Sequence, residues 1–168
     1  MNSSHDREKA DQLQAVIKCL SIQDVYMRGT QVHLADTFDP TQPDIPLTIR
    51  FKIATKGSHY IGNIDDQKPN IMRFLVEGGI RFMPPDDKQK DQEILAEITA
   101  GFVADYYVLE DNLIEEGIEQ FANQNVIYHV WPYLREYVES MCQRFRLPTV
   151  VLPMYQFPPE NRPQTKSE

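Results

Sequence analysis

The sequence has no long apolar run, few cysteines and no leader-like N-terminus. None of its 168 residues belongs to an apolar stretch of about 18, so we expect no membrane-spanning helix. The opening residues MNSSHDREKADQ lack an apolar core and a cleavage pattern, so we expect no secretory signal. The two cysteines, Cys19 and Cys142, lie far apart, which favours reduced thiols and a cytoplasmic location.

Positive charge is also scarce. The chain has 17 Lys and Arg against 25 Asp and Glu, for a formal net charge of -8. Because binding to nucleic acid phosphates requires clustered cations, we expect no nucleic acid partner. Residues 91–134 contain no Lys or Arg, but they contain nine acids: Asp91, Glu93, Glu97, Asp105, Glu110, Asp111, Glu115, Glu116 and Glu119. This block is either a solvated acidic face or a surface that attracts basic segments of a partner.

Recognisable catalytic motifs are absent. There is no phosphate-binding GxxxxGK[ST] loop, no GxGxxG and no GxSxG nucleophile elbow. The four histidines, His5, His33, His59 and His129, form no HxxxH or HExxH pair, and neither cysteine belongs to a CxxC. We therefore expect a binding protein with no metal and no cofactor rather than an enzyme. The enzymatic alternative is a site assembled from distant residues such as His129 and Glu97.

Alternating apolar and polar residues predict four strands. The pattern covers residues 20–34, 47–55, 72–82 and 94–108. In the first, Tyr26, Thr30, Val32 and Leu34 share the apolar parity. Short links between consecutive strands indicate an antiparallel sheet with one dry and one wet face. Residues 55–70 are interpreted as a long hairpin loop. Gly78 and Gly79 predict a bulge or a strong twist in the third strand.

Three helical segments complete the chain. Residues 6–20 have helical spacing and form either a short amphipathic helix or a frayed end. Residues 109–125 predict a short helix. A longer helix is expected from about Pro132 to Arg146, with Pro132 in its first turn, where a missing N–H costs nothing. The apolar stripe of this helix comprises Val130, Leu134, Tyr137, Val138, Met141 and Phe145.

The long helix has more apolar surface than one stripe requires. Trp131 and Tyr133 lie beside the stripe and widen it. One stripe covers the dry face of the sheet, so the surplus indicates a second protein surface or a ligand groove. The expected fold class is therefore α+β, a four-stranded antiparallel sheet with one face covered by a long C-terminal helix.

Residues 20–153 resemble the SecB-like bacterial chaperones. The resemblance is carried by IQDVYMRG at the first strand, LAEITAGF in the fourth, and NVIYHVWPYLREYVESM followed by LPTVVLP. Its most specific part is the set Trp131, Pro132, Tyr133, Arg135 and Glu136. The predicted organisation is an N-terminal extension or short helix at 1–19, a SecB-like domain at 20–153, and a proline-rich flexible tail at 154–168.

The resemblance implies a homotetramer, built as a dimer of dimers, that holds unfolded polypeptide in apolar grooves without ATP. Aromatic and Met side chains suit such grooves because they accept many sequences. The expected groove residues are Ile45, Leu47, Phe51, Tyr133, Tyr137, Met141, Phe145, Leu152, Tyr155 and Phe157. Three readings stay open: a holdase specialised for the antitoxin of a toxin–antitoxin system, a dedicated adaptor that binds one antitoxin and ignores generic unfolded protein, and a general chaperone that delivers preproteins to the export ATPase SecA.

The resemblance also implies a SecA-type docking face on the wet side of the sheet. Leu95 and Glu97 match the family pattern there, whereas Gly29 and His33 replace acids. Arg50, Lys52, Arg73 and Arg81 are expected on the same face and dilute its negative charge. The proline-broken segment MYQFPPENRPQ replaces a further helix of export members. Both departures favour a specialised chaperone over a general export chaperone.

Overall fold

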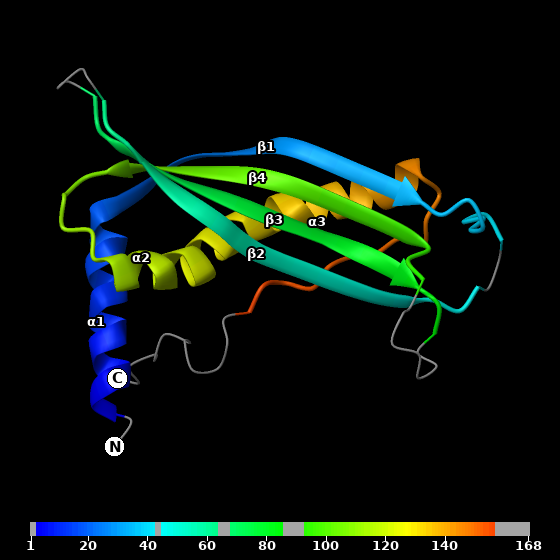
Figure 1. Cartoon of the computed structure of the whole chain (residues 1–168), viewed down its shortest axis with the longest axis horizontal. Helices are drawn as coiled ribbons and strands as arrows, with labels where there is room; N and C mark the ends of the chain where they lie inside the picture. The colour runs from blue at the N-terminus through cyan, green and yellow to red at the C-terminus, as the bar shows by residue number, and fades with distance from the viewer. Residues whose placement is uncertain (1–2, 43–44, 64–67, 86–92, 157–168) are drawn as a thin grey trace.

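The computed structural model describes residues 3–42, 45–63, 68–85 and 93–156. It confirms the α+β class. Four antiparallel strands, β1 (Leu20–Leu34), β2 (Thr48–Ile61), β3 (Ile71–Met83) and β4 (Ala96–Val108), form one sheet in the order β1-β4-β3-β2. The C-terminal helices lie on one face of this sheet, and no helix of the described residues covers the other face (Figure 1). We call these the helix face and the outer face.

The two central strands follow the predicted alternation. In β3, Met72, Phe74, Val76, Ile80 and Phe82 are buried on the helix face. In β4 the buried side chains on the same face are Ala96, Ile98, Ala100, Phe102, Ala104 and Tyr106. Because β3 and β4 pair without a register shift, these two sets form one continuous apolar floor.

Edge strand β1 differs from the prediction for Tyr26. Its register with β4 shifts by one residue at Gln23 and again at Arg28. Between these two bulges, Val25 faces the helices, and Tyr26 lies on the outer face opposite Val103. A one-residue bulge exchanges the two faces of a strand, and the second bulge restores them. Simple alternation therefore assigned Tyr26 to the wrong side.

Strand β2 also differs, because it continues to Ile61 through residues predicted to be a loop. Its bulge lies at Lys56, between Thr55 and Gly57. The expected bulge at Gly78 and Gly79 is wrong, since both pair regularly with β2 and β4.

These two glycines serve close packing instead. A Cβ on Gly78 would lie 2.6 Å from Cδ2 of Leu134 on the long helix. A Cβ on Gly79 would collide with the carbonyl oxygen of Ile98 in β4. Glycine thus lets the helix approach β3, and lets β3 lie against β4 at this point.

The C-terminal helices form one continuous run. Helix α2 (Glu115–Phe121) leads into a π-helical turn, η1 (Ala122–Val126), and then into α3 (Ile127–Arg144). The residues at both junctions have right-handed helical backbone angles. The predicted helix start near Pro132 is therefore wrong, and Pro132 lies inside α3. Proline removes one backbone donor but does not always end a helix whose other face is well packed.

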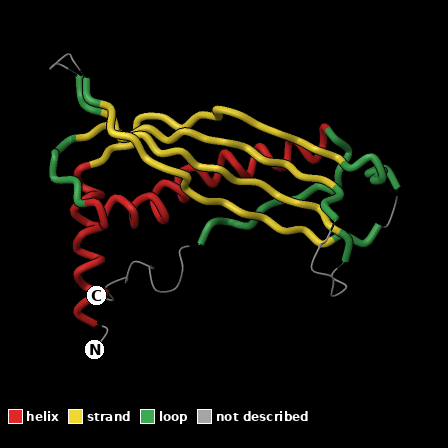
Figure 2. The backbone as a smooth tube through the Cα atoms, viewed as in Figure 1, coloured by secondary structure: helices red, strands yellow, loops and turns green. Residues whose placement is uncertain are grey.

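The N-terminal segment is a helix, α1 (Ser3–Cys19), rather than a frayed end. It packs against α2 at one end of the sheet (Figure 2). Val16 and Cys19 are buried there. A Cβ on Gly117 of α2 would lie 2.7 Å from the backbone oxygen of Gln12, so glycine allows the two helices to touch. The predicted division at residue 19 stays a prediction.

After α3 the chain reverses and runs back beside it (Figure 1). Leu147 N donates to the Cys142 carbonyl over 2.9 Å, and Arg146 N donates to Gln143 over 3.3 Å. Arg146 has a φ of 56°, the left-handed conformation of a Schellman cap. This reversal brings residues 147–156, which we call the returning segment, against the helix, where Leu147 and Leu152 are buried.

Candidate functional site: apolar surfaces beside helix α3

Helix α3 covers the centre of the sheet. Its stripe of Val130, Leu134, Val138 and Cys142 is buried. Burial raises the pKa of the Cys142 thiol, which keeps it protonated and unreactive. The two flanks of this stripe face opposite edges of the sheet.

The flank facing β2 is built around Trp131. Its indole packs edge-on against Phe51 of β2, with 5.8 Å between ring centroids, and against Tyr155 of the returning segment at 5.6 Å. Its Nε1–H donates to the Pro153 carbonyl oxygen over 2.8 Å. Tyr155 also contacts Tyr128 at 6.2 Å, and burial raises the Tyr155 pKa. These contacts fix the returning segment to α3, and Trp131 in turn joins α3 to β2.

Large apolar side chains remain exposed around this cluster. Ile49 and Phe51 point to the helix face because they lie opposite Phe82 and Ile80 in β3. Phe51 is 53% exposed despite its contact with Trp131. We call the β2-side surface the exposed set Ile49, Phe51, Tyr128, Val151 and Met154. It lies along an edge strand, whose outer backbone groups have no neighbouring strand in the described part of the chain.

The flank facing β1 is different. Tyr137 contacts Thr30 of β1 through their hydroxyl groups, and burial raises the Tyr137 pKa. Tyr133 lies one turn earlier on the same flank and is 47% exposed. Ile22 and Met27 project from the helix face of β1 and are also exposed. We call Ile22, Met27 and Tyr133 the β1-side surface.

The expected groove residues are thus divided between the two flanks. Phe51 and Tyr155 contact Trp131 on the β2 side, whereas Tyr133 and Tyr137 lie on the β1 side. Leu152 is buried in the core. Ile45, Leu47 and Met141 are partly buried against the core, and Phe145 is exposed at the end of α3. Phe157 lies outside the described residues. Client contact by these residues stays a prediction.

The expected surplus of apolar surface on α3 is largely covered by the chain itself. Trp131 is 5% exposed and Tyr137 is 6% exposed within one protomer. The reason is the returning segment, which closes over Trp131, and the contact of Tyr137 with β1. Of the apolar side chains expected along this helix, Tyr133 and Phe145 remain substantially exposed. The surfaces left for a partner are therefore the β2-side surface and the β1-side surface, which includes Tyr133.

Sequence reasoning did not identify Tyr128, Val151, Met154, Ile22 or Met27 as surface-forming. The signal for Met27 was hidden because it lies between the two bulges of β1, where the parity is exchanged, whereas Ile22 has the predicted apolar parity and was simply not singled out. Tyr128 was placed before the expected helix start. The accessible positions on the returning segment depend on a chain reversal that has no sequence pattern of its own.

One buried polar pair joins α3 to the sheet. The hydroxyl of Tyr106 in β4 and Nδ1 of His129 are 2.8 Å apart. Burial raises the pKa of Tyr106 and lowers the pKa of His129. At neutral pH the pair is therefore a neutral phenol and a neutral imidazole, which suits a packing contact between helix and sheet.

This pair predicts a loss of stability on acidification. The His129 pKa lies lower in the folded chain than its ordinary value near 6.5, so the unfolded chain binds the proton more readily. The free energy of unfolding should fall as pH drops from about 7 toward the folded pKa. Urea unfolding of wild type and His129→Gln across pH 5–8 measures this. The difference between their free energies of unfolding should change with pH. If the two free energies have the same pH dependence, the lowered pKa of His129 does not contribute to stability.

Of the predicted docking residues, Glu97 lies on the outer face of β4, and Leu95 immediately precedes that strand and packs partly against the core. Glu97 accepts a hydrogen bond from Nε of Arg81 over 2.6 Å, and both Glu97 and Leu95 are partly exposed. Glu97 is thus already neutralised by a cation of the same chain. His129, in contrast, contacts Tyr106 on the helix face. The sheet separates Glu97 from His129, so the enzymatic alternative built on these two residues does not assemble.

Other chemical sites are not apparent in the described ranges. Their His, Cys, Asp and Glu side chains form no group of three or more that could hold a metal ion. None of the helices described is both long and apolar enough to cross a membrane.

Comparison with known proteins identifies the fold. No family model and no curated protein matches the chain. Among solved structures, it is similar to the SecB-like chaperone Rv1957 of Mycobacterium tuberculosis, in complex with a ChAD peptide from the Rv1956 HigA1 antitoxin. The TM-score is 0.64 at 19% identity, over 88% of this chain and 99% of that one.

A second solved structure is a protein of unknown function from Streptococcus agalactiae. Its TM-score is 0.38 at 11% identity, over 80% of this chain and 96% of that one, which is too distant to inform the fold.

The likeness to the mycobacterial chaperone agrees with the antiparallel sheet, the long C-terminal helix and the order of elements. The chain has the SecB-like fold.

Proposed function

We propose that this protein is an ATP-independent holdase chaperone that binds non-native polypeptide on its β2-side surface. The observation that carries the proposal is the set of exposed apolar side chains from three separate segments, β2, α3 and the returning chain, around one buried tryptophan. Large apolar side chains exposed around a buried aromatic cluster favour a site for another polypeptide. The SecB-like fold supports this reading.

The composition of this surface suits clients of varied sequence. Phe51 and Tyr128 offer large flat area, while Met154 adapts its shape to its neighbour. An extended client can also add main-chain hydrogen bonds to the edge of β2. Each 100 Å² of apolar area buried contributes about 2.5 kcal/mol before ordering costs, so a few side-chain contacts give useful but reversible binding.

We further propose a dedicated client, namely the antitoxin of a toxin–antitoxin pair. The similar mycobacterial protein was solved with an antitoxin peptide, which supports this choice. The acidic docking pattern expected of an export chaperone is weak here, because Arg81 neutralises Glu97. A dedicated client would require an affinity well above that for generic unfolded chains.

The β1-side surface supports the proposed homotetramer. Ile22, Met27 and Tyr133 expose apolar area along the other edge of the sheet, where no strand covers β1 among the described residues. A second copy of the chain would cover this area, and two such dimers would complete a tetramer. Light scattering should give a mass of about four chains at micromolar concentration, and a monomer would contradict the assembly.

Delivery of preproteins to SecA is the second candidate, supported by Glu97 on the outer face and by Leu95 just before β4. The deciding experiment follows light scattering from an aggregating client and from an antitoxin, each with this protein in stoichiometric amount and without nucleotide. The proposal expects suppression of scattering, strongest for the antitoxin. Unchanged scattering for both would remove the holdase function, and tight binding to SecA would favour the second candidate.

A further inference from the structure

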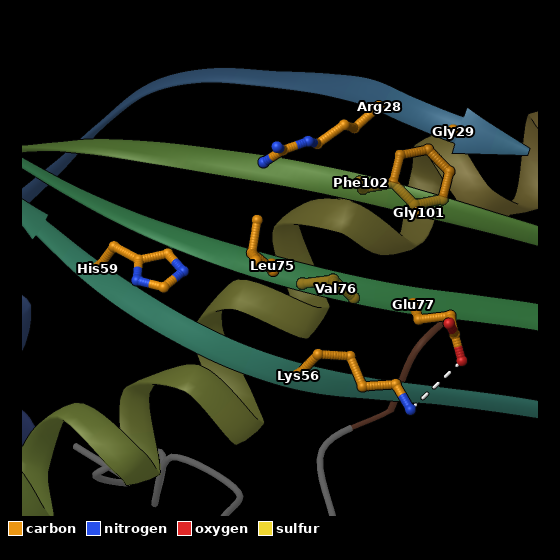
Figure 3. A pocket seen from close by; sticks show the side chains of 9 residues that line it. All are labelled: Arg28, Gly29, Lys56, His59, Leu75, Val76, Glu77, Gly101 and Phe102. Atoms are coloured by element: carbon orange, nitrogen blue, oxygen red, sulfur yellow. Dashed lines mark ion pairs between the residues drawn. The ribbon is translucent and has the colours of Figure 1, made fainter.

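The outer face of the sheet, away from the β2-side surface, contains an open hollow of about 460 Å³. Its floor comprises Leu75 and Gly101 with the backbone of the central strands, and its rim carries Arg28, Lys56 and His59, with the carboxylate of Glu77 paired to Lys56 (Figure 3). Arg28 reaches over the floor from β1, while Lys56 and His59 reach it from β2 at the opposite edge (Figure 3). Cationic side chains from the two edge strands therefore flank an apolar centre.

Both bulges of the sheet that border this hollow place a cation there. Arg28 is the extra residue of β1 between Met27 and Gly29, and Lys56 is the extra residue of β2. Bulges commonly redirect a side chain that regular alternation would aim elsewhere. Two separate bulges, one in β1 and one in β2, thus each direct a basic side chain to the same hollow.

The glycines of this patch are not required by the fold. A Cβ on Gly29 or on Gly57 would meet no atom within 4 Å, and one on Gly101 would only approach a backbone oxygen at 3.9 Å. None of them has a positive φ. This contrasts with Gly79 and Gly117, where neighbouring backbone leaves no room.

Glycine within a strand lowers the stability of the folded chain by about 0.5–1 kcal/mol relative to alanine. Where packing does not require it, bare backbone on a sheet suits the close approach of another chain. Gly29 and Gly101 lie directly opposite each other in neighbouring strands, and both line the hollow together with Leu75. The backbone of these two glycines is therefore not covered by side chains of their own.

The ion pairs of the outer face leave positive charge at this rim. Arg73 is neutralised by Asp105 through two hydrogen bonds of 2.8 and 2.7 Å. Glu77, in contrast, is shared by Lys52 at 3.6 Å and Lys56 at 3.3 Å. Arg28 has no carboxylate partner among the described residues, in a chain whose net charge is -8.

We infer that this hollow binds an extended acidic segment of a partner protein. The segment lies along the central strands with its backbone over Gly101, and its side chains on one side pass over Gly29 toward Arg28. Successive side chains of an extended chain point to opposite sides, so neighbouring carboxylates reach Arg28 on one rim and Lys56 or His59 on the other. Because these pairs are exposed, the binding is modest and weakens as salt rises.

The test measures fluorescence anisotropy of a labelled octaglutamate peptide with the full-length protein at low and physiological ionic strength. Saturable binding that weakens with salt is expected. Arg28→Glu/Lys56→Glu should weaken it at least tenfold. The matched control Lys18→Glu/Arg144→Glu changes the net charge equally at exposed sites outside the hollow and should leave most of the binding intact.

A second variant separates occupancy of the hollow from charge. No atom lies within 4 Å of a Cβ at Gly29, and β-branched residues suit strands, so Gly29→Val should fold normally by circular dichroism and still weaken peptide binding at least tenfold. The inference is overturned if octaglutamate does not saturate, if both double variants lose binding equally, or if Gly29→Val binds like wild type. Stronger binding of an eight-residue oligothymidylate would assign the hollow to nucleic acid instead. Aggregation suppression through the β2-side surface is independent of all these outcomes.

Discussion

Replacing Trp131 by alanine is expected to lower the free energy of unfolding by about 3–5 kcal/mol. The indole is 5% exposed and contacts Phe51, Tyr155 and the Pro153 carbonyl. Truncation would leave a cavity between α3, β2 and the returning segment, and it would release that segment from the helix. Urea unfolding measures the first effect, and amide hydrogen exchange at residues 147–156 measures the second.

Trp131→Phe is the matched control, because it retains an aromatic ring but loses the N–H donor. Trp131→Phe should lower the free energy of unfolding clearly less than Trp131→Ala does. It should also keep most of the protection from amide exchange at residues 147–156. Should Trp131→Ala prevent folding altogether, Trp131→Leu supplies an intermediate cavity for the same comparison. A loss below about 1 kcal/mol for alanine, with unchanged protection of residues 147–156, would contradict the role given to Trp131.

Replacing Ile49 and Phe51 together by serine is expected to weaken binding of an unfolded client about 30- to 100-fold. Both side chains are substantially exposed on the helix face of β2. Losing their burial against a client removes about 2–3 kcal/mol, and 1.4 kcal/mol corresponds to a factor of ten. Fluorescence anisotropy with a labelled, permanently unfolded polypeptide measures the change directly.

The control for this prediction is Tyr26→Ser/Tyr107→Ser. These tyrosines are 37% and 36% exposed, but they lie on the outer face. The control should bind the client as wild type does. Equal losses in both double variants would indicate nonspecific adhesion to apolar surface, and unchanged binding in Ile49→Ser/Phe51→Ser would place the client elsewhere.

The central strands could be predicted from sequence because their burial is simple. In β3 and β4 one face meets the helices, so apolar residues recur at every second position without a bulge. The edge strands were harder. The register shifts at Gln23, Arg28 and Lys56 come from unpaired backbone residues and not from a change in composition. Two of the bulge residues also border the hollow of the outer face.

The helices illustrate a different limit. Pro132 is a helix breaker by local preference, yet tertiary packing of Trp131 and Leu134 keeps it within α3. The π-helical turn at 122–126 has no sequence pattern that distinguishes it from an ordinary helix.

The candidate site was only partly predictable for a geometric reason. Helical spacing identified Tyr133, Tyr137 and Trp131 as apolar positions, but it did not show that Trp131 and Tyr137 face opposite edges of the sheet. The chain reversal at Arg146 then decided which of them is covered. This reversal depends on a left-handed backbone conformation at Arg146, which is not a glycine, so no local sequence pattern predicted the reversal.

Site-specific cross-linking tests the central claim most directly. A photoreactive phenylalanine analogue is placed at position 51 on the β2-side surface, at 133 on the β1-side surface, or at 107 on the outer face. The account predicts nucleotide-independent cross-links from position 51 to an unfolded client, cross-links between copies of the chain from position 133, and neither from position 107. Client cross-links mainly from 107, or none from 51, would contradict it.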